Sequence, residues 1–142
     1  MWGNCSSTLC TRIERLQNRA GRAILKVPVR TSSQLIRERL DWKSLSDLRY
    51  EHLCVLVYKC VAGFVPQYLQ ATFSSVKNYH SYETRSSTQG NMALNLKPRT
   101  EAGRRTFLFR GAKAWNALDA QLKTPLPVSA ATFKSLYRTT LT

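Results

Sequence analysis

Apolar residues recur every three or four positions along the first part of the chain, and basic residues recur between them at the same interval. The stretch RIERLQNRAGRAILK, residues 12–26, shows both series. At 100° per residue the apolar positions fall in an arc of about 100°, and the basic positions in an adjacent arc of about 80°. The apolar arc consists of Leu9, Ile13, Leu16, Ala20, Ala23, Ile24 and Val27, and the basic row of Arg12, Arg15, Arg19, Arg22 and Lys26. We predict an amphipathic helix that packs through the apolar arc, presents the basic row and ends before Pro28.

A second helix is indicated after residue 44. The sequence Ser44-Leu45-Ser46-Asp47 matches a capping box with Asp47 as its acidic member. Apolar residues then surround the helix on almost every side as far as Val61, and Gly63 fits the C′ position that ends it. This helix should be the central, buried one. Between it and the first helix, residues 31–33 offer caps for a short helix that carries Leu35, Ile36 and Leu40.

A polar segment with little periodicity, residues 74–91, divides the chain. Residues 1–73 are predicted to form an N-terminal helical part that includes the basic amphipathic helix. Residues 92–142 are predicted to form a hairpin followed by C-terminal helices. At 142 residues the chain is long enough for one domain, so we expect one compact domain overall.

The C-terminal part combines strand-like and helical patterns. Met92, Leu94 and Leu96 alternate with polar residues, and Arg105–Arg110 has the composition of a strand, so the two are predicted to pair across Lys97–Gly103. Gly111 would open a helix over Ala112–Leu122 with Trp115 and Leu118 facing inward. Ser129 would cap a last helix with Phe133, Leu136 and Tyr137 on its apolar side. The predicted fold class is mostly α, a helical domain with a small antiparallel β-hairpin.

Charge suggests the kind of partner. Twenty-two Lys and Arg against eight Asp and Glu give a net charge of +14, so we expect an anionic partner, nucleic acid before an acidic membrane surface. A membrane role is disfavoured because the apolar arc contains the small residues Ala20 and Ala23 and no aromatic anchor. With no apolar run long enough to span a bilayer and no signal-peptide pattern, we expect an intracellular protein, in the nucleus or cytoplasm, that is not secreted.

Two groups of residues are candidate nucleic-acid contacts. The first is the basic row, for which a merely solvated helix face is the alternative. The second comprises Lys97, Arg99, Arg104, Arg105, Arg110 and Lys113. Phe107, Phe109 and Trp115 are interspersed among these cations, and bases stack on such rings while guanidinium groups hold phosphates. The alternative for the rings is burial in the core, which leaves the cations available in either case.

Catalytic and metal-binding patterns are not found. The carboxylates form no close pair, and Asp41, Asp47 and Asp119 fit capping roles. The four cysteines, with spacings of four and five intervening residues, match neither a zinc ribbon nor a Cys-x-x-C pair. We therefore expect no catalytic residue, no metal site and no cofactor, and cysteines present as thiols in a reducing compartment.

The order of several short motifs resembles a known family. They are WG (2–3), RIERLQNRAGRAIL (12–25), DWKSL (41–45), VYKC (57–60), PQYL (66–69), LKPRT (96–100), GRRTF (103–107) and WNAL (115–118). Together they resemble the C-terminal region of the reverse-transcriptase polyprotein of non-LTR retrotransposons, of the LINE type and jockey-like group. The resemblance runs over essentially the whole chain.

The resemblance implies a parent protein with an endonuclease, an RNA-directed DNA polymerase and this tail. The metal-binding aspartates of the polymerase have no counterpart in this sequence, so the chain is expected not to be an enzyme. What the resemblance implies for the tail is a role in holding template RNA or target DNA. The two groups of cations predict that such binding depends little on sequence. Two alternatives stay open: a protein-interaction module that docks on the polymerase domain, and a nonfunctional relic.

Overall fold

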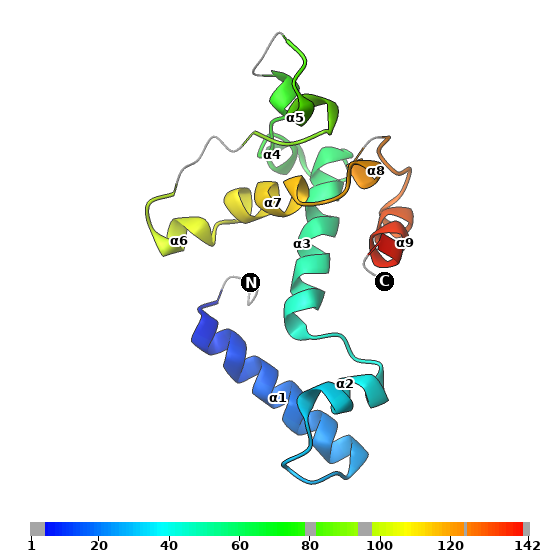
Figure 1. The fold of residues 1–142 in the computed structure, drawn as a ribbon. Coiled ribbons are helices and arrows are strands. Elements are labelled where there is room, and N and C mark those ends of the chain that lie inside the picture. Colours follow the sequence, from blue (N-terminus) through cyan, green and yellow to red (C-terminus); the bar gives the residue numbers. More distant parts are fainter. Residues whose placement is uncertain (1–4, 79–81, 94–97, 124, 141–142) are drawn as a thin grey trace. The chain divides into compact units, whose positions relative to one another are not determined.

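The computed structural model describes residues 5–78, 82–93, 98–123 and 125–140. Within them the chain is mostly helical, as predicted (Figure 1). It divides into two compact units, Met1–Arg49 and Tyr50–Thr142, and the boundary falls within helix α3, Leu45–Val61. The polar segment 74–91 contains a 3-10 turn, Val76–Asn78, and the short helix α5, Arg85–Thr88.

The first unit is built on a helix pair. Helix α1 spans Ser7–Leu25 and is capped by Ser6, and helix α2 spans Ser33–Leu40 and is capped by Ser32. The two helices meet at Gly21, where an added Cβ would lie 2.4 Å from Ile36 Cγ2 and 3.3 Å from Leu40 Cδ1. The contact therefore needs a residue without a side chain at position 21. Ile36 is completely buried by it.

The side of α1 that packs differs from the predicted one. Leu9, Leu16 and Ile24 of the apolar arc are 46%, 62% and 58% exposed. The packed side is centred on Gly21, and Gln17 on this side donates a hydrogen bond to the Lys43 carbonyl at 3.1 Å. Close backbone approach at Gly21, rather than the number of apolar side chains, therefore selects the contact face. On the helical wheel Gly21 lies roughly 140° from the middle of the basic row.

Helix α3 follows the sequence prediction at both ends. The Ser44 hydroxyl accepts a hydrogen bond from the Asp47 amide at 3.1 Å and donates to the Asp47 carboxylate at 2.6 Å. At the other end, the Phe64 amide donates to the Lys59 carbonyl at 2.9 Å, and Gly63 has a φ of 81°. This is the hydrogen bond that closes a Schellman motif, and it confirms Gly63 as the residue that ends the helix.

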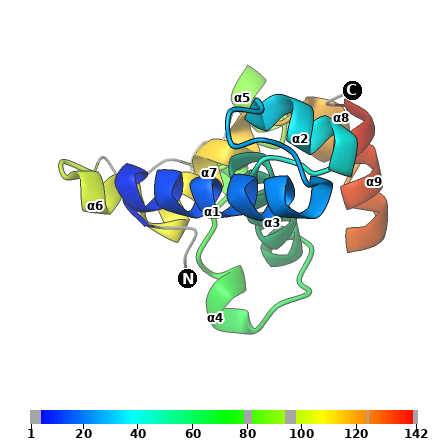
Figure 2. The ribbon, with the colours of Figure 1, turned by 90° about the horizontal axis from the view of Figure 1, so that it is seen from below.

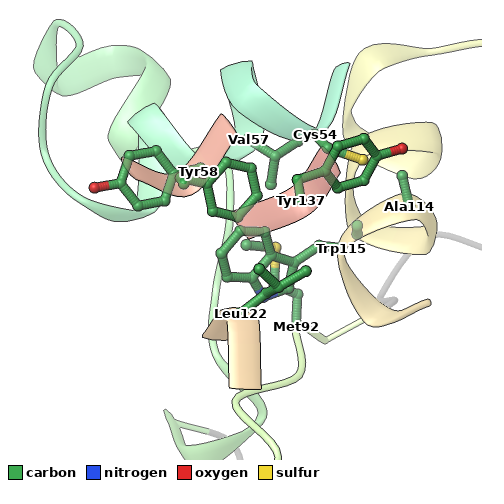
Figure 3. Close-up of a cluster of buried hydrophobic side chains, with 10 residues drawn as sticks. Cys54, Val57, Tyr58, Met92, Ala114, Trp115, Leu122 and Tyr137 are labelled. Atoms are coloured by element: carbon green, nitrogen blue, oxygen red, sulfur yellow. The ribbon is translucent and has the colours of Figure 1, made fainter. Parts of the chain in front are cut away.

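The second unit surrounds the remainder of α3. Its other helices are α4 (Gln67–Gln70), α5, α6 (Glu101–Arg104), α7 (Phe107–Asn116), α8 (Ala120–Lys123) and α9 (Ala130–Thr140). Buried side chains of α3, α7 and α9 form most of its core, together with Met92 and Leu122 (Figure 3). Tyr58 stacks on Phe133 with ring centroids 4.6 Å apart, and Trp115 lies 6.2 Å from the same ring. Helix α6 lies on the side of α7 remote from α9 in both views (Figures 1 and 2).

The predicted strand over Arg105–Arg110 is wrong. Arg105 ends α6, Thr106 precedes α7, and the segment from Phe107 onward is the first turn of α7. This segment is helical despite its strand-like composition. As part of α7 it packs closely against Val57 and Phe73, because Gly111 has no side chain at the point of contact. An added Cβ would lie 2.9 Å from Val57 Cγ2 and 2.8 Å from Phe73 Cζ.

The rest of the predicted hairpin is not seen in the described residues. Leu94, Leu96 and Lys97 lie outside them, and Met92 forms an isolated antiparallel bridge with Ser75. The helix predicted over Ala112–Leu122 is confirmed in part, but its bounds are wrong: α7 begins at Phe107 and ends at Asn116, and Ala120–Lys123 forms the separate helix α8. Trp115 and Leu118 do face inward.

The last helix is confirmed, with one correction. Ser129 accepts a hydrogen bond from the Thr132 amide at 3.1 Å, as a cap does, and Phe133 and Tyr137 are buried. Leu136, predicted on the same apolar side, is 45% exposed. On the helical wheel Leu136 lies about 100° from Tyr137, at the edge of the side that packs on the core.

Candidate nucleic-acid interface

The basic row lies along one side of α1. Arg12, Arg15, Arg19 and the capping residue Lys26 are exposed. Arg22 is half-buried, and its Nη2 donates to the Thr31 carbonyl at 3.0 Å, so part of this guanidinium group fastens the loop between α1 and α2. The acid of this stretch, Glu14, lies 3.6 Å from Arg49. Three exposed arginines therefore follow one another at helical spacing, and Lys26 lies just beyond the last turn of α1.

The second group of cations gathers around a cavity of about 430 Å³ in the second unit. Arg104 and Arg105 reach it from the end of α6, and Arg110 and Lys113 from α7. The cavity is lined by these four cations and by Tyr50, Leu53, Glu101, Phe109, Ala114 and Ala117. The structure thus brings together four of the six predicted cations around one concave surface. We call this surface the α6–α7 cavity.

The remaining two predicted cations are not part of this cavity. Arg99 is exposed before α6, and Lys97 lies outside the described residues. The acidic residue that lines the cavity, Glu101, is paired with Arg105. Arg105 Nε is 3.9 Å from the Glu101 carboxylate and donates a hydrogen bond to the Glu101 carbonyl at 3.3 Å. Arg105 is therefore partly neutralised by Glu101, whereas Arg104 and Lys113 are exposed to solvent.

From the sequence, Phe107, Phe109 and Trp115 could each belong either to the core or to the candidate site, and the structure assigns each of them to one of the two. Trp115 is 1% exposed and donates from Nε1 to the Gly90 carbonyl at 3.0 Å, so it belongs to the core. Phe107 meets Phe73 edge-on, with ring centroids 5.3 Å apart, and packs against the core as well. Phe109 is half-buried and lines the cavity together with the four cations.

Tyr50 is a site residue that the sequence reasoning missed. It lies on α3, far from the cations in sequence, and its hydroxyl donates to the Ala114 carbonyl at 3.5 Å. Burial raises the pKa of the Tyr50 hydroxyl, so the ring stays neutral at physiological pH. The sequence indicates Tyr50 only through its spacing of three residues from Leu53, which places both side chains on one side of α3. The packing of α7 against that side is a long-range property.

Other kinds of site receive no support from the part of the chain that the structure describes. No three His, Cys, Asp or Glu side chains among the described residues converge as metal ligands would. No described helix has both the length and the apolar character needed to cross a bilayer. Searches against protein families, curated proteins and solved structures find no match for this chain.

Proposed function

We propose that this chain binds RNA or DNA with little sequence preference, and that it is a non-catalytic C-terminal piece of a retrotransposon reverse transcriptase. The observation that carries the binding proposal is the α6–α7 cavity, where four cations and two rings share one concavity. The motif order described above supports the placement in that family. Polymerisation would be carried out by the parent protein, and the tail would hold template RNA or target DNA.

The cavity offers both kinds of contact that a single strand needs. Arg104, Arg110 and Lys113 would neutralise successive phosphates, and the rings of Tyr50 and Phe109 would stack on an unpaired base. Such contacts read the backbone and the π-face of a base, which all sequences share. These three cations, engaged with a single strand, would contribute about −2 to the slope of log affinity against log salt concentration.

The test combines charge removal at the cavity with the same charge removal elsewhere. Changing Arg104, Arg110 and Lys113 to Gln should weaken binding to single-stranded RNA and DNA and flatten the salt slope by about 2. The matched control changes three exposed arginines outside both candidate surfaces, Arg30, Arg39 and Arg85, and so removes the same net charge. Affinity is measured by fluorescence anisotropy with labelled oligonucleotides at several salt concentrations.

The outcomes distinguish binding at the α6–α7 cavity from attraction by the net charge of the chain. Retained affinity in the control with a loss in the cavity variant supports the proposal. An equal loss in both would mean that net charge alone attracts nucleic acid, and unchanged affinity in the cavity variant would refute the site. A companion variant with Arg12, Arg15 and Arg19 changed to Gln measures the contribution of the basic row in the same assay.

A second candidate function is favoured by one observation, the exposed apolar arc of α1. Leu9, Leu16 and Ile24 are large, exposed and aligned on one side of a helix, as in a surface that docks on another protein. The occupant would be the polymerase domain of the parent protein. Cross-linking the chain to that domain with and without RNA separates the candidates, since docking through the arc does not require RNA and is lost when Leu16 and Ile24 become Ser.

A further inference from the structure

Two of the four cysteines lie side by side in the first unit. The Sγ atoms of Cys5 and Cys10 are 3.2 Å apart, about 1.2 Å more than the length of a disulfide bond. Cys5 comes just before Ser6, the residue that caps α1, and the Cys10 amide donates to the Ser6 carbonyl at 3.0 Å in the first turn. One thiol therefore lies in the first turn of α1 and the other just before its capping residue, so the two sulfur atoms are already in contact before any oxidation.

A third side chain makes the two thiols unequal. Arg49 Nη1 lies 2.8 Å from Cys10 Sγ, and the same guanidinium group lies 3.6 Å from Glu14. The hydrogen bond from Cys5 lowers the pKa of Cys10, and the hydrogen bond and charge of Arg49 lower it further, although burial and Glu14 act in the opposite direction. The pKa of Cys5 is raised, chiefly by its hydrogen bond to Cys10. Cys10 is therefore the thiol of the pair that ionises more readily, and Cys5 the one that holds its proton more tightly.

We propose that Cys5 and Cys10 form a peroxide-reactive dithiol site, in which Cys10 attacks a small hydroperoxide and Cys5 then closes an intramolecular disulfide. The contact between the two sulfur atoms and the guanidinium group beside Cys10 carry the proposal. It does not depend on the binding function proposed above.

The reaction balances with hydrogen peroxide as the oxidant. The Cys10 thiolate attacks one peroxide oxygen, so that an S–O bond forms, the O–O bond breaks, and the hydroxide that leaves takes a proton to become water. The Cys5 sulfur then attacks Cys10 Sγ, the S–S bond forms, and the S–O bond breaks with loss of a second water. Two thiols lose two electrons in total, and one peroxide is reduced to two waters.

The other two cysteines provide an internal comparison. Cys54 is fully buried in the core of the second unit and Cys60 is 3% exposed. Burial raises the pKa of Cys54 to about 12 and that of Cys60 in the same direction. Because the thiolate is the reactive form, both should remain reduced while the pair is oxidised.

The experiment exposes the reduced 142-residue chain to stoichiometric hydrogen peroxide and maps the cysteines by alkylation and mass spectrometry. The expected product is a monomer with a Cys5–Cys10 disulfide and with Cys54 and Cys60 free. A disulfide between two chains, or oxidation of all four cysteines at the same rate, would overturn the proposal. Accumulation of sulfinic acid on Cys10 without a disulfide would do so as well.

The role of Arg49 is tested through reaction rates. Arg49→Gln should slow alkylation of Cys10 at neutral pH by about threefold for each unit by which its pKa rises, because lost thiolate is partly offset by greater nucleophilicity. Arg39→Gln, an exposed charge on α2, should leave the rate unchanged. The pH profile of wild-type alkylation is a second measurement that needs no variant. A midpoint for Cys10 at or above that of an ordinary thiol would contradict the assigned roles.

Discussion

Glu51 is the residue in which charge and burial are most directly opposed. It is 1% exposed, yet it carries a carboxylate that accepts hydrogen bonds from Arg138 Nη2 at 2.9 Å and Nε at 3.1 Å. Lys134 lies 3.5 Å from the same oxygen. Both cations come from α9, whereas Glu51 belongs to α3, so the group ties the last helix to the central one. A buried carboxylate is stable only when it is paired in this way.

Replacing Glu51 should therefore loosen the attachment of α9. Glu51→Gln keeps the shape but removes the charge that the two cations face, and we expect a loss of about 1.5–3 kcal/mol in the free energy of unfolding. Urea denaturation followed by circular dichroism measures it. Glu101→Gln is the matched control, because Glu101 is 70% exposed in its pair with Arg105 and its loss should change stability by less than about 1 kcal/mol. Equal effects of the two changes would contradict the assigned role of burial.

At the scale of the elements, the packing of α1 on α2 is governed by one glycine. In an isolated helix, Gly21→Ala would be favourable by about 1 kcal/mol because alanine loses less backbone entropy. In this structure the added Cβ would lie 2.4 Å from Ile36 Cγ2, and overpacking of that kind costs about 1–3 kcal/mol. We expect Gly21→Ala to lower the melting temperature.

A compensating change checks the reason for that effect. Ile36→Ala removes the Cγ2 atom that the new methyl group would meet, at the cost of a buried side chain. In an Ile36→Ala background, Gly21→Ala should no longer destabilise the chain and should recover part of the helix propensity. Thermal unfolding of the two single variants and the double variant gives the coupling. Additive effects would mean that Gly21 acts through backbone freedom alone.

Sequence patterns predicted those elements whose signals are local. The caps of α3 and α9 and the glycine after α3 are short-range features, and the structure confirms them. The Phe107–Arg110 segment has strand composition but forms a helix, because Gly111 lets α7 lie close to Val57 and Phe73, which are distant in sequence. The same limit applies to the candidate site. The cations could be identified from the sequence, but the place of Tyr50 among them depends on how α7 packs on α3.

At the scale of the whole molecule, a net charge of +14 destabilises the folded chain but favours binding to a polyanion. Like charges repel one another within the folded chain, and salt screens that repulsion over about 8–10 Å at physiological concentrations. The same salt weakens attraction to a polyanion, because the counterions that binding releases gain less entropy in a more concentrated solution. Stability and affinity should therefore respond to ionic strength in opposite directions.

Raising sodium chloride from about 20 to 200 mM should increase the melting temperature of the free chain and reduce its affinity for an oligonucleotide over the same range. Thermal unfolding and fluorescence anisotropy measure the two quantities on one preparation. The variant with Arg30, Arg39 and Arg85 changed to Gln serves as the control. Its lower charge should flatten the salt dependence of stability, whereas the variant lacking Arg104, Arg110 and Lys113 should flatten both dependences. If salt lowers the melting temperature, attractive ion pairs such as Glu51 with Arg138 outweigh the repulsion, and the chain does not need an anionic partner to relieve its charge.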